Sequence, residues 1–442
     1  MKDGMRWFPV LNSRWYVLLI LTLVYTLNIA DRFVLSTLIE PIKSEFALTD
    51  AEVGLLTGAV LAVFYVTAGI PLGFLADRIN RKRMIVVSLT AWSLLTALCG
   101  ATRSFMELLL ARIGVGIGEA GGTPPSQSLL ADRFHPRERA MAMSLFAIGA
   151  AAGAALGSSL GGYLNDAYGW RFVLIAFGAM GLPVALILAL SVSEPLRGEL
   201  DASPASQEPA NLREALRFIA RRPSLLHTLA GVTIITFWGW GLMWWTPSFL
   251  ARSHAMTLSE IGEHLGLMHA LGGTAVTLGT AWAMHRMAGK DPRYQAWFVG
   301  GTTLLATAPS MLAYWVSSEA AAIALLWLFI PVTYLYIGPT LALAQNLVPA
   351  TMRALISAVL VFVANVANLV VAPLLIGFLS DVLSTRIADP AQSLRYVLMA
   401  CSLTGLWASA HYFAAARRLA HDLARPVDDQ RSATQAAAVT GA

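Results

Sequence analysis

Long blocks of apolar residues recur along the whole chain, separated by short polar segments. Each block is close to the roughly 20 residues that a helix needs to cross a bilayer. The pattern predicts an all-α membrane protein with twelve transmembrane helices, because a helix satisfies its own backbone in lipid. The predicted spans are 15–39, 52–76, 84–102, 106–131, 140–164, 171–192, 225–250, 258–284, 295–316, 320–346, 354–380 and 395–416.

One polar stretch interrupts this pattern and divides the spans six and six. It contains four prolines and, near its end, a run of arginines around apolar residues at helical spacing. That run predicts a basic amphipathic helix on the inner leaflet. We expect two pseudo-symmetric six-helix bundles (1–192 and 225–418), a cytoplasmic linker (193–224) and a disordered cytoplasmic tail (419–442).

The two halves are weakly repeated. Val53-Gly54-x3-Gly58 has a counterpart in Ile261-Gly262-x3-Gly266, and Gly162-Tyr-Leu-Asn-Asp166 has one in Gly377-Phe-Leu-Ser-Asp381. Parallel repeats of this kind predict a carrier whose halves rock about a site between them.

The placement of the charges changes how the basic net charge of +5 is interpreted. With the N-terminus inside, 23 of the 31 Lys and Arg residues fall on the inner side and six on the outer side. This asymmetry follows the positive-inside rule. It predicts a protein of the bacterial inner (cytoplasmic) membrane with both termini cytoplasmic, and it removes the nucleic-acid interpretation.

Two predicted spans carry charged residues deep in their interior: Asp31 and Arg32 in the first, Arg112 and Glu119 in the fourth. Each charge at mid-bilayer costs at least ~2.5–3.5 kcal/mol, so a partner or a use is expected. Asp31 and Arg112 lie at similar depth and could pair, which favours the charged form of Asp31, whereas burial of Glu119 favours its neutral form. Two acids that differ in this way could pass a proton as a cavity opens. The alternative is a static ion pair that holds two helices together.

The loop after the second span reads Gly73-Phe-Leu-Ala-Asp77-Arg78-Ile-Asn-Arg81-Lys82-Arg83. It resembles the signature loop of the major facilitator superfamily almost position for position. Gly73 allows two helices to approach closely. We expect Asp77 to contact a basic or helix-end group of the other half at the inner face and so to stabilise the outward-facing state. The alternative is an ordinary positively charged inner loop.

The fifth span carries glycines at a spacing of four: Gly149, Gly153, Gly157 and Gly161. They form one stripe along a helix, which predicts close packing or sliding of a second helix. The position matches the family's antiporter motif, but the usual Gly-Pro step is replaced by Gly157-Ser158. The stripe therefore predicts a tight pivot better than it predicts antiport.

Further motifs resemble the Spinster branch of this superfamily over essentially the whole chain. They are Asn28-Ile-Ala-Asp31-Arg32-Phe33, Gly118-Glu119-Ala120, Pro125-Ser126, Ala131-Asp132-Arg133-Phe134, Arg137-Glu138-Arg139-Ala140 and Gly338-Pro339-Thr340 through Met352-Arg353-Ala354. The resemblance implies a proton-coupled carrier of lysophospholipid-like or other amphiphilic substrates. It also implies that Asp31 and Glu119 are the coupling acids and that Arg32 is their partner or a headgroup ligand.

Aromatic and amide side chains in later spans complete the candidate substrate site. Membrane-interface positions explain Trp244 and Trp245, whereas deeper aromatic residues could line an apolar tail pocket. Asn365 and Asn368 could bind substrate or bridge helices, and we favour bridging. The candidate substrate residues are Asn28, Arg32, Glu119, Phe237, Trp238, Trp240, Tyr334, Tyr336 and Asn365.

We predict a monomeric, proton-coupled carrier of lipid-like or amphiphilic substrates that works by alternating access among membrane lipids. A small-solute or multidrug carrier is the alternative. A polytopic membrane enzyme or sensor is more remote, because no catalytic, nucleotide-binding or metal-ligand motif occurs in the sequence. The pattern accordingly predicts neither a cofactor nor a metal.

Overall fold

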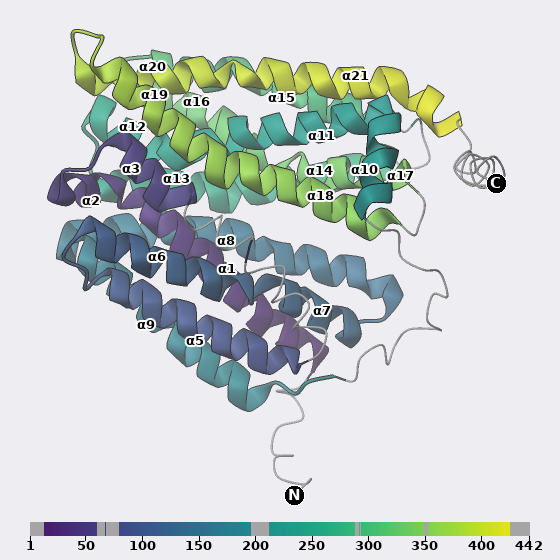
Figure 1. Ribbon diagram of the computed structural model, residues 1–442, viewed down its shortest axis with the longest axis horizontal. Helices are drawn as coiled ribbons and strands as arrows, with labels where there is room; N and C mark the ends of the chain where they lie inside the picture. The colour runs from purple at the N-terminus through teal and green to yellow at the C-terminus, as the bar shows by residue number, and fades with distance from the viewer. Residues whose placement is uncertain are drawn as a thin grey trace, which may run out of the picture.

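The structure, a computed structural model, describes residues 13–59, 67, 79–195, 212–287, 291, 293–348 and 352–424. These residues are almost entirely helical (Figure 1). The elements of the first half are α1 (Arg14–Thr37), α2 (Ile39–Phe46), α3 (Asp50–Gly54), η2 (Leu55–Ala59), α5 (Arg81–Cys99), α6 (Phe105–Ala120), α7 (Thr123–Arg133), α8 (Pro136–Tyr168) and α9 (Trp170–Ser191).

The helices of the second half follow α10 (Leu212–Arg221). They are α11 (Pro223–Thr236), η3 (Phe237–Gly241), α12 (Leu242–His254), α13 (Leu258–Leu267), η4 (Met268–Gly273), α14 (Thr274–Met287), α15 (Arg293–Trp315), α16 (Glu319–Phe329), η5 (Ile330–Tyr334), α17 (Ile337–Asn346), α18 (Arg353–Asn365), η7 (Val366–Val371), α19 (Ala372–Ser384), η8 (Pro390–Gln392), α20 (Ser393–Ser402) and α21 (Thr404–Ala424).

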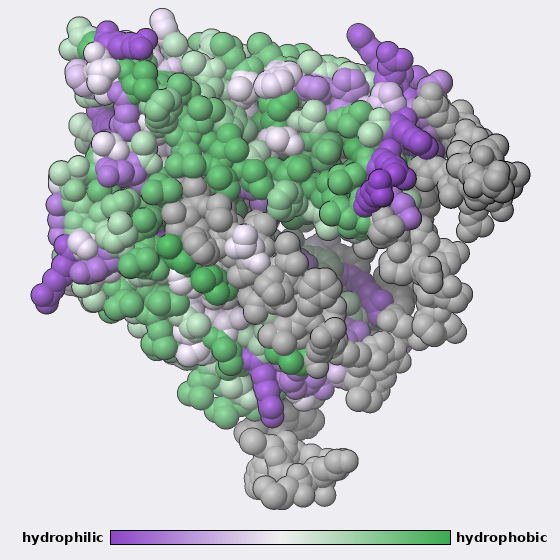
Figure 2. Space-filling view, viewed as in Figure 1, coloured by the Kyte–Doolittle hydropathy of each residue, from purple (hydrophilic) through white to green (hydrophobic). Residues whose placement is uncertain are grey.

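Eight helical stretches among the described residues are long and apolar enough to cross a membrane. Figure 2 shows apolar side chains over most of the middle of one face, with hydrophilic side chains gathered toward its two ends. This distribution is that of a protein embedded in a bilayer. The count of twelve spans stays a prediction.

Two groups of helices lie side by side (Figure 1). In the first, α1 packs against α8 and α5 packs against α6 and α9. In the second, α21 packs against α11 and α15. The groups meet where α8 packs against α13 and where α3 packs against α19, at the end that the charge pattern predicts to face outward. We call this the outer end.

The predicted fourth span, 106–131, is divided into α6 and α7. The break falls at Gly121 and Gly122, immediately before the first turn of α7 with its two prolines, Pro124 and Pro125. Proline has no backbone N–H, and its ring clashes with the preceding turn, so two successive prolines after two glycines favour a break there. Glu119 is the second-last residue of α6 and therefore lies beside this break.

Part of the predicted linker is helical, but it does not lie freely on the inner leaflet. On α10, Ala215, Phe218 and Ile219 are buried, and the helix packs against α11 and α18. Leu212 and Leu216, which the sequence assigns to the same apolar face, are about half exposed. Residues 196–211 of the linker and 425–442 of the tail lie outside the described residues.

Candidate functional site

A cavity of about 470 Å³ lies between the two groups of helices. Figure 2 shows a hollow between the groups, on the side of the molecule where α10 lies in Figure 1. The first half contributes polar side chains to the wall, among them Asn28, Arg32 and Gln127. The second half contributes Trp240, Trp244 and a largely aliphatic surface. The cavity therefore has one polar and one mainly apolar side.

Arg32 connects this cavity to a buried acid. Its Nε donates to Glu119 Oε2 at 2.9 Å, and its Nη2 lies 2.7 Å from the same oxygen. The Glu119 side chain is 0% exposed, whereas 14% of the Arg32 side chain is exposed and lines the cavity. No hydrogen-bond partner among the described residues reaches Glu119 Oε1. A ligand in the cavity can thus reach Arg32 directly and Glu119 only through it.

Asp31 and Arg112 form the ion pair that their similar depth makes possible. Arg112 Nη1 lies 2.8 Å from Asp31 Oδ2, and Thr96 Oγ1 donates to Asp31 Oδ1 at 2.7 Å. Both charged side chains are at most 5% exposed, and neither lines the cavity. Two buried ion pairs therefore lie side by side in the first half, and only the Arg32–Glu119 pair borders the cavity.

Phe33, the residue after Arg32, reaches the other half. Its ring centroid lies 4.8 Å from that of Trp244, 5.0 Å from His269 and 6.3 Å from Trp240. Three consecutive residues of α1 therefore contact three different surroundings, because successive helix positions point about 100° apart. Asp31 faces the first-half interior, Arg32 faces the cavity, and Phe33 lines the same cavity where it meets the second half.

The structure brings most of the predicted substrate residues to the cavity. Asn28, Arg32, Trp240, Tyr336 and Asn365 line it, and Glu119 lies behind Arg32.

Three predicted substrate residues do not line this cavity. Trp238 is fully buried in the second half, where its Nε1 donates to Ser310 Oγ at 3.1 Å. Phe237 packs against the core, and Tyr334 lies behind Trp240 with ring centroids 5.2 Å apart. Helical geometry accounts for Trp238, which lies two positions from Trp240 and so points about 200° away from it.

The interface explanation is wrong for Trp244 and Trp245. Trp244 is 8% exposed and lines the cavity, and Trp245 is 1% exposed. The Trp244 indole Nε1 donates to Asn368 Oδ1 at 3.1 Å, which supports the helix-bridging role for that asparagine. A tryptophan near the end of a span suggests the lipid interface, but here the outer ends of the helices pack against the other half.

The predicted gating residues are only partly described. Gly73, Asp77 and Arg78 lie outside the described residues. Arg81 is buried, pairs with Asp132, and donates from Nε to Glu194 Oε1 at 2.7 Å. All of these partners precede α10, so Arg81 ties together the inner ends of first-half helices.

Arg83, the last predicted gating residue, is exposed. Its backbone N–H donates to the Asn80 side chain at the start of α5, at 2.8 Å.

The glycine stripe of α8 lies against α1. A Cβ added at Gly153 would lie 2.4 Å from the Thr26 carbonyl oxygen, and one at Gly157 would lie 2.5 Å from that of Ala30. Gly149 and Gly161 face the same helix. Any side chain at the two central positions would push α1 away, and α1 carries both Asp31 and Arg32.

A family model described as the Major Facilitator Superfamily matches residues 21–372. The chain belongs to the major facilitator superfamily. An MFS-type efflux pump of Mycolicibacterium smegmatis is 32% identical over 403 residues, which cover 91% of this chain and 93% of that protein. Protein spinster homolog 1 of Homo sapiens is 28% identical over 454 residues, covering 94% of this chain and 83% of that protein.

A solved structure gives the same assignment. A bacterial homologue of the human lysosomal transporter Spinster, in an inward-facing and unoccupied conformation, matches with a TM-score of 0.83 and 29% identity. The match covers 94% of this chain and 99% of that chain. This major facilitator protein is therefore a multi-pass transporter of the Spinster type. It acts on a small-molecule substrate and is not an enzyme.

Proposed function

We propose that this protein is a proton-coupled secondary transporter of amphiphilic, lipid-like substrates that works by alternating access. The observation that carries the proposal is the position of Arg32, which faces the cavity and holds the buried Glu119 carboxylate at 2.7 Å. One guanidinium thus connects the substrate space with an acid that can take up a proton.

The cavity wall supports an amphiphilic substrate with an anionic headgroup. Arg32 can pair with a phosphate or carboxylate, and Asn28 and Gln127 add hydrogen-bonding groups beside it. The opposite wall, which includes Val232 and Leu360, offers aliphatic surface to a hydrocarbon chain.

Competition for Arg32 supplies the coupling. An anionic headgroup that draws the guanidinium away from Glu119 leaves a buried carboxylate without its partner, which raises its affinity for a proton. Binding of the substrate and binding of the proton then favour each other, as linkage requires. For an anionic substrate this favours cotransport with protons, whereas a cation would compete with the proton and favour exchange.

A multidrug or small-solute carrier is the second candidate. The match to the efflux pump of Mycolicibacterium smegmatis covers 91% of this chain and 93% of the pump. The cavity also contains aromatic side chains, which suit flat apolar molecules. Such molecules, when cationic, would be attracted to aromatic faces rather than to Arg32.

Flux measurements distinguish the two candidates. Protein in liposomes is given a pH gradient and either a fluorescent lysophospholipid analogue or a lipophilic cationic dye. We expect proton-driven movement of the lysophospholipid, which Arg32→Ala abolishes. Movement of the dye alone, unaffected by Arg32→Ala, would favour the multidrug carrier.

The topology and the inner gate follow from the charge pattern and the signature loop. We propose an inner-membrane monomer with both termini cytoplasmic, in which Asp77 stabilises the outward-facing state. Labelling of a cysteine at Gln207 only from the outside would contradict this orientation. Asp77→Asn should shift distances measured by double electron–electron resonance toward the inward-facing state.

A further inference from the structure

At the outer end, the two halves meet at two contacts that are built alike, one between α3 and α19 and one between α13 and α8. In each, a helix begins with a Thr-x-x-Glu capping box, at Thr49 and Glu52 for α3 and at Thr257 and Glu260 for α13. The start of α3, in the first half, faces the end of α19 in the second half. The start of α13, in the second half, faces the end of α8 in the first half. We call the two contacts the α3–α19 latch and the α8–α13 latch.

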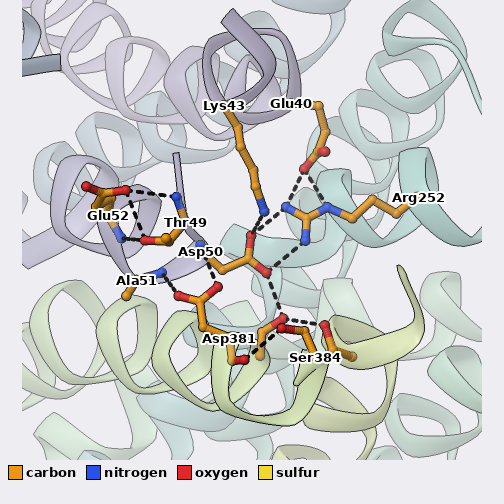
Figure 3. A network of polar contacts seen from close by, with 11 residues as sticks. Glu40, Lys43, Thr49, Asp50, Ala51, Glu52, Arg252, Asp381 and Ser384 are labelled. Atoms are coloured by element: carbon orange, nitrogen blue, oxygen red, sulfur yellow. Dashed lines mark hydrogen bonds and ion pairs between the residues drawn. The ribbon is translucent and has the colours of Figure 1, made fainter. Parts of the chain in front are cut away.

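An aspartate closes each latch. The carboxylate of Asp381 on α19 accepts the backbone N–H groups of Asp50 at 2.9 Å and Ala51 at 2.7 Å (Figure 3). The carboxylate of Asp166 on α8 accepts the backbone N–H of Ser259 at 2.8 Å. A carboxylate at the start of a helix satisfies otherwise unpaired N–H groups and is stabilised by the helix dipole. Here each carboxylate does so across the two halves.

Glycines allow the same close approach in both latches. A Cβ at Gly377 would lie 2.2 Å from the Asp50 carbonyl oxygen, and one at Gly162 would lie 2.0 Å from that of Leu258. Asp50 and Leu258 therefore occupy equivalent places, each as the first residue of its helix. The two latches differ in the chemistry of this residue, which is charged in one and apolar in the other.

Asp50 adds an ion-pair network that has no counterpart at Leu258. Its side chain is buried, and its two oxygens accept Nη1 and Nη2 of Arg252 at 2.9 and 2.8 Å (Figure 3). Lys43 pairs with the same carboxylate, and Ser380 Oγ on α19 donates to it at 2.7 Å. Arg252 also lies 2.8 Å from Glu40. The network joins α2 and α3 of the first half to α12 and α19 of the second.

Asp50 keeps its charge in this setting. Burial favours its neutral form, but the hydrogen bonds and charges of Arg252 and Lys43 outweigh burial and lower its pKa to about 2. Asp166, by contrast, is exposed to solvent, where an interaction of one carboxylate is weakened by water. The α8–α13 latch has one further hydrogen bond, from Ser159 Oγ to the Gly262 carbonyl oxygen at 2.9 Å, but among the described residues no ion pair joins α8 to α13. The ion pairs of Asp50 therefore make the α3–α19 latch the stronger of the two.

We infer that the outer gate parts in a fixed order: the α8–α13 latch separates first, and the Asp50–Arg252 network holds the α3–α19 latch closed longer. Asp50, Arg252 and Asp381 are then gating residues of the outer end. The inference rests on the proposed alternating access, but not on the proposed substrate or proton coupling.

Two pairs of spin labels on the full chain in liposomes test the order. Tyr163 with Glu263 reports on the α8–α13 latch, and Ser44 with Phe378 reports on the α3–α19 latch, since all four residues are exposed. In the wild type, we expect the fraction of long distances to be about tenfold larger at the α8–α13 latch. Equal fractions at the two latches would overturn the order.

Substitutions assign the order to Asp50. Asp50→Asn should raise the long-distance fraction at the α3–α19 latch about tenfold and leave the other latch unchanged. Asp166→Asn, the matched control, should do the reverse. Should Asp50→Asn fail to fold, Ser380→Ala removes one hydrogen bond from the same carboxylate and should cause a smaller shift, of about threefold.

The outcomes separate the inference from the proposed function. An unchanged α3–α19 distance in both Asp50→Asn and Ser380→Ala would overturn the role of Asp50 while leaving alternating access intact. Distances that never lengthen at either latch, under any gradient, would overturn alternating access and the ordered gate with it.

Discussion

Glu119→Gln tests whether this buried acid couples protons to transport. The substitution replaces a carboxylate that is 0% exposed with a neutral amide of almost the same shape. The amide oxygen can still accept a hydrogen bond from Arg32, whose side chain is 14% exposed to the cavity. We therefore expect a modest loss of stability, about 1–3 kcal/mol, which is the range for weakening a hydrogen bond to a charged group.

The expected effect on coupling is much larger than the effect on stability. A gradient of one pH unit stores about 1.36 kcal/mol per proton, enough for about tenfold accumulation of a substrate that moves with one proton. Glutamine cannot bind and release that proton. Accumulation should fall from about tenfold to none, whereas substrate binding and exchange without a gradient should remain.

The assay is uptake of a fluorescent lysophospholipid analogue into liposomes with and without a pH gradient, beside binding by calorimetry. Glu107→Gln is the matched control, because Glu107 lies on the same helix, α6, but is exposed at its first turn. This control should behave like the wild type. Wild-type pH dependence of flux in Glu119→Gln would refute the reasoning, and Glu119 would then be a packing residue.

Three further outcomes are expected. Asp31→Asn should destabilise the protein by about 3–5 kcal/mol, more than Glu119→Gln, because it leaves Arg112 buried without its charge partner; thermal unfolding in detergent measures the difference. Gly153→Val should lower the unfolding temperature, since overpacking costs about 1–3 kcal/mol, whereas Gly301→Ala, whose added Cβ meets no atom within 4 Å, should not. The low pKa of Asp50 in the closed latch means that its stabilising contribution is complete above its ordinary pKa and is lost only as the pH falls through about 2. In Glu119→Gln, the spin-label distances across the α3–α19 latch should therefore stay constant between about pH 5 and pH 8. A pH-dependent change in these distances would contradict the conclusion that Asp50 stays charged in the closed latch.

The sequence predicts the parts of this protein that depend on local pattern or on the bilayer. Apolar blocks, charge asymmetry and the signature loop lead to the fold and family. Similar depth makes an Asp31–Arg112 pair possible, because lipid leaves a charged residue few alternatives to a partner at the same level, and the structure contains this pair.

Contacts between the halves are harder to predict, because they depend on how two bundles meet. Trp244 lies near the end of a predicted span, and only the packing of Phe33 against it places it on the cavity wall. Asp50 and Arg252 are about two hundred positions apart, at the outer ends of two helices, and nothing in the sequence marks them as partners. The rotation of each helix about its axis is also hard to predict from the sequence. Trp238 and Trp240 are two residues apart, yet only Trp240 lines the cavity.

The contacts of three consecutive residues of α1 imply that a rotation of this helix about its axis would change all three at once. Its side chains reach about 5–6 Å from the helix axis, so a turn of about 10° about that axis moves each tip by about 1 Å. Asp31, Arg32 and Phe33 would all move in that single turn, each against a different neighbour. The glycine stripe of α8 presents no side chains to α1, so it offers a smooth surface against which α1 could rotate. The Asp31–Arg112 pair, the cavity wall and the facing bundle would then be joined by the stiffness of one helical segment, without any chain of intermediate residues.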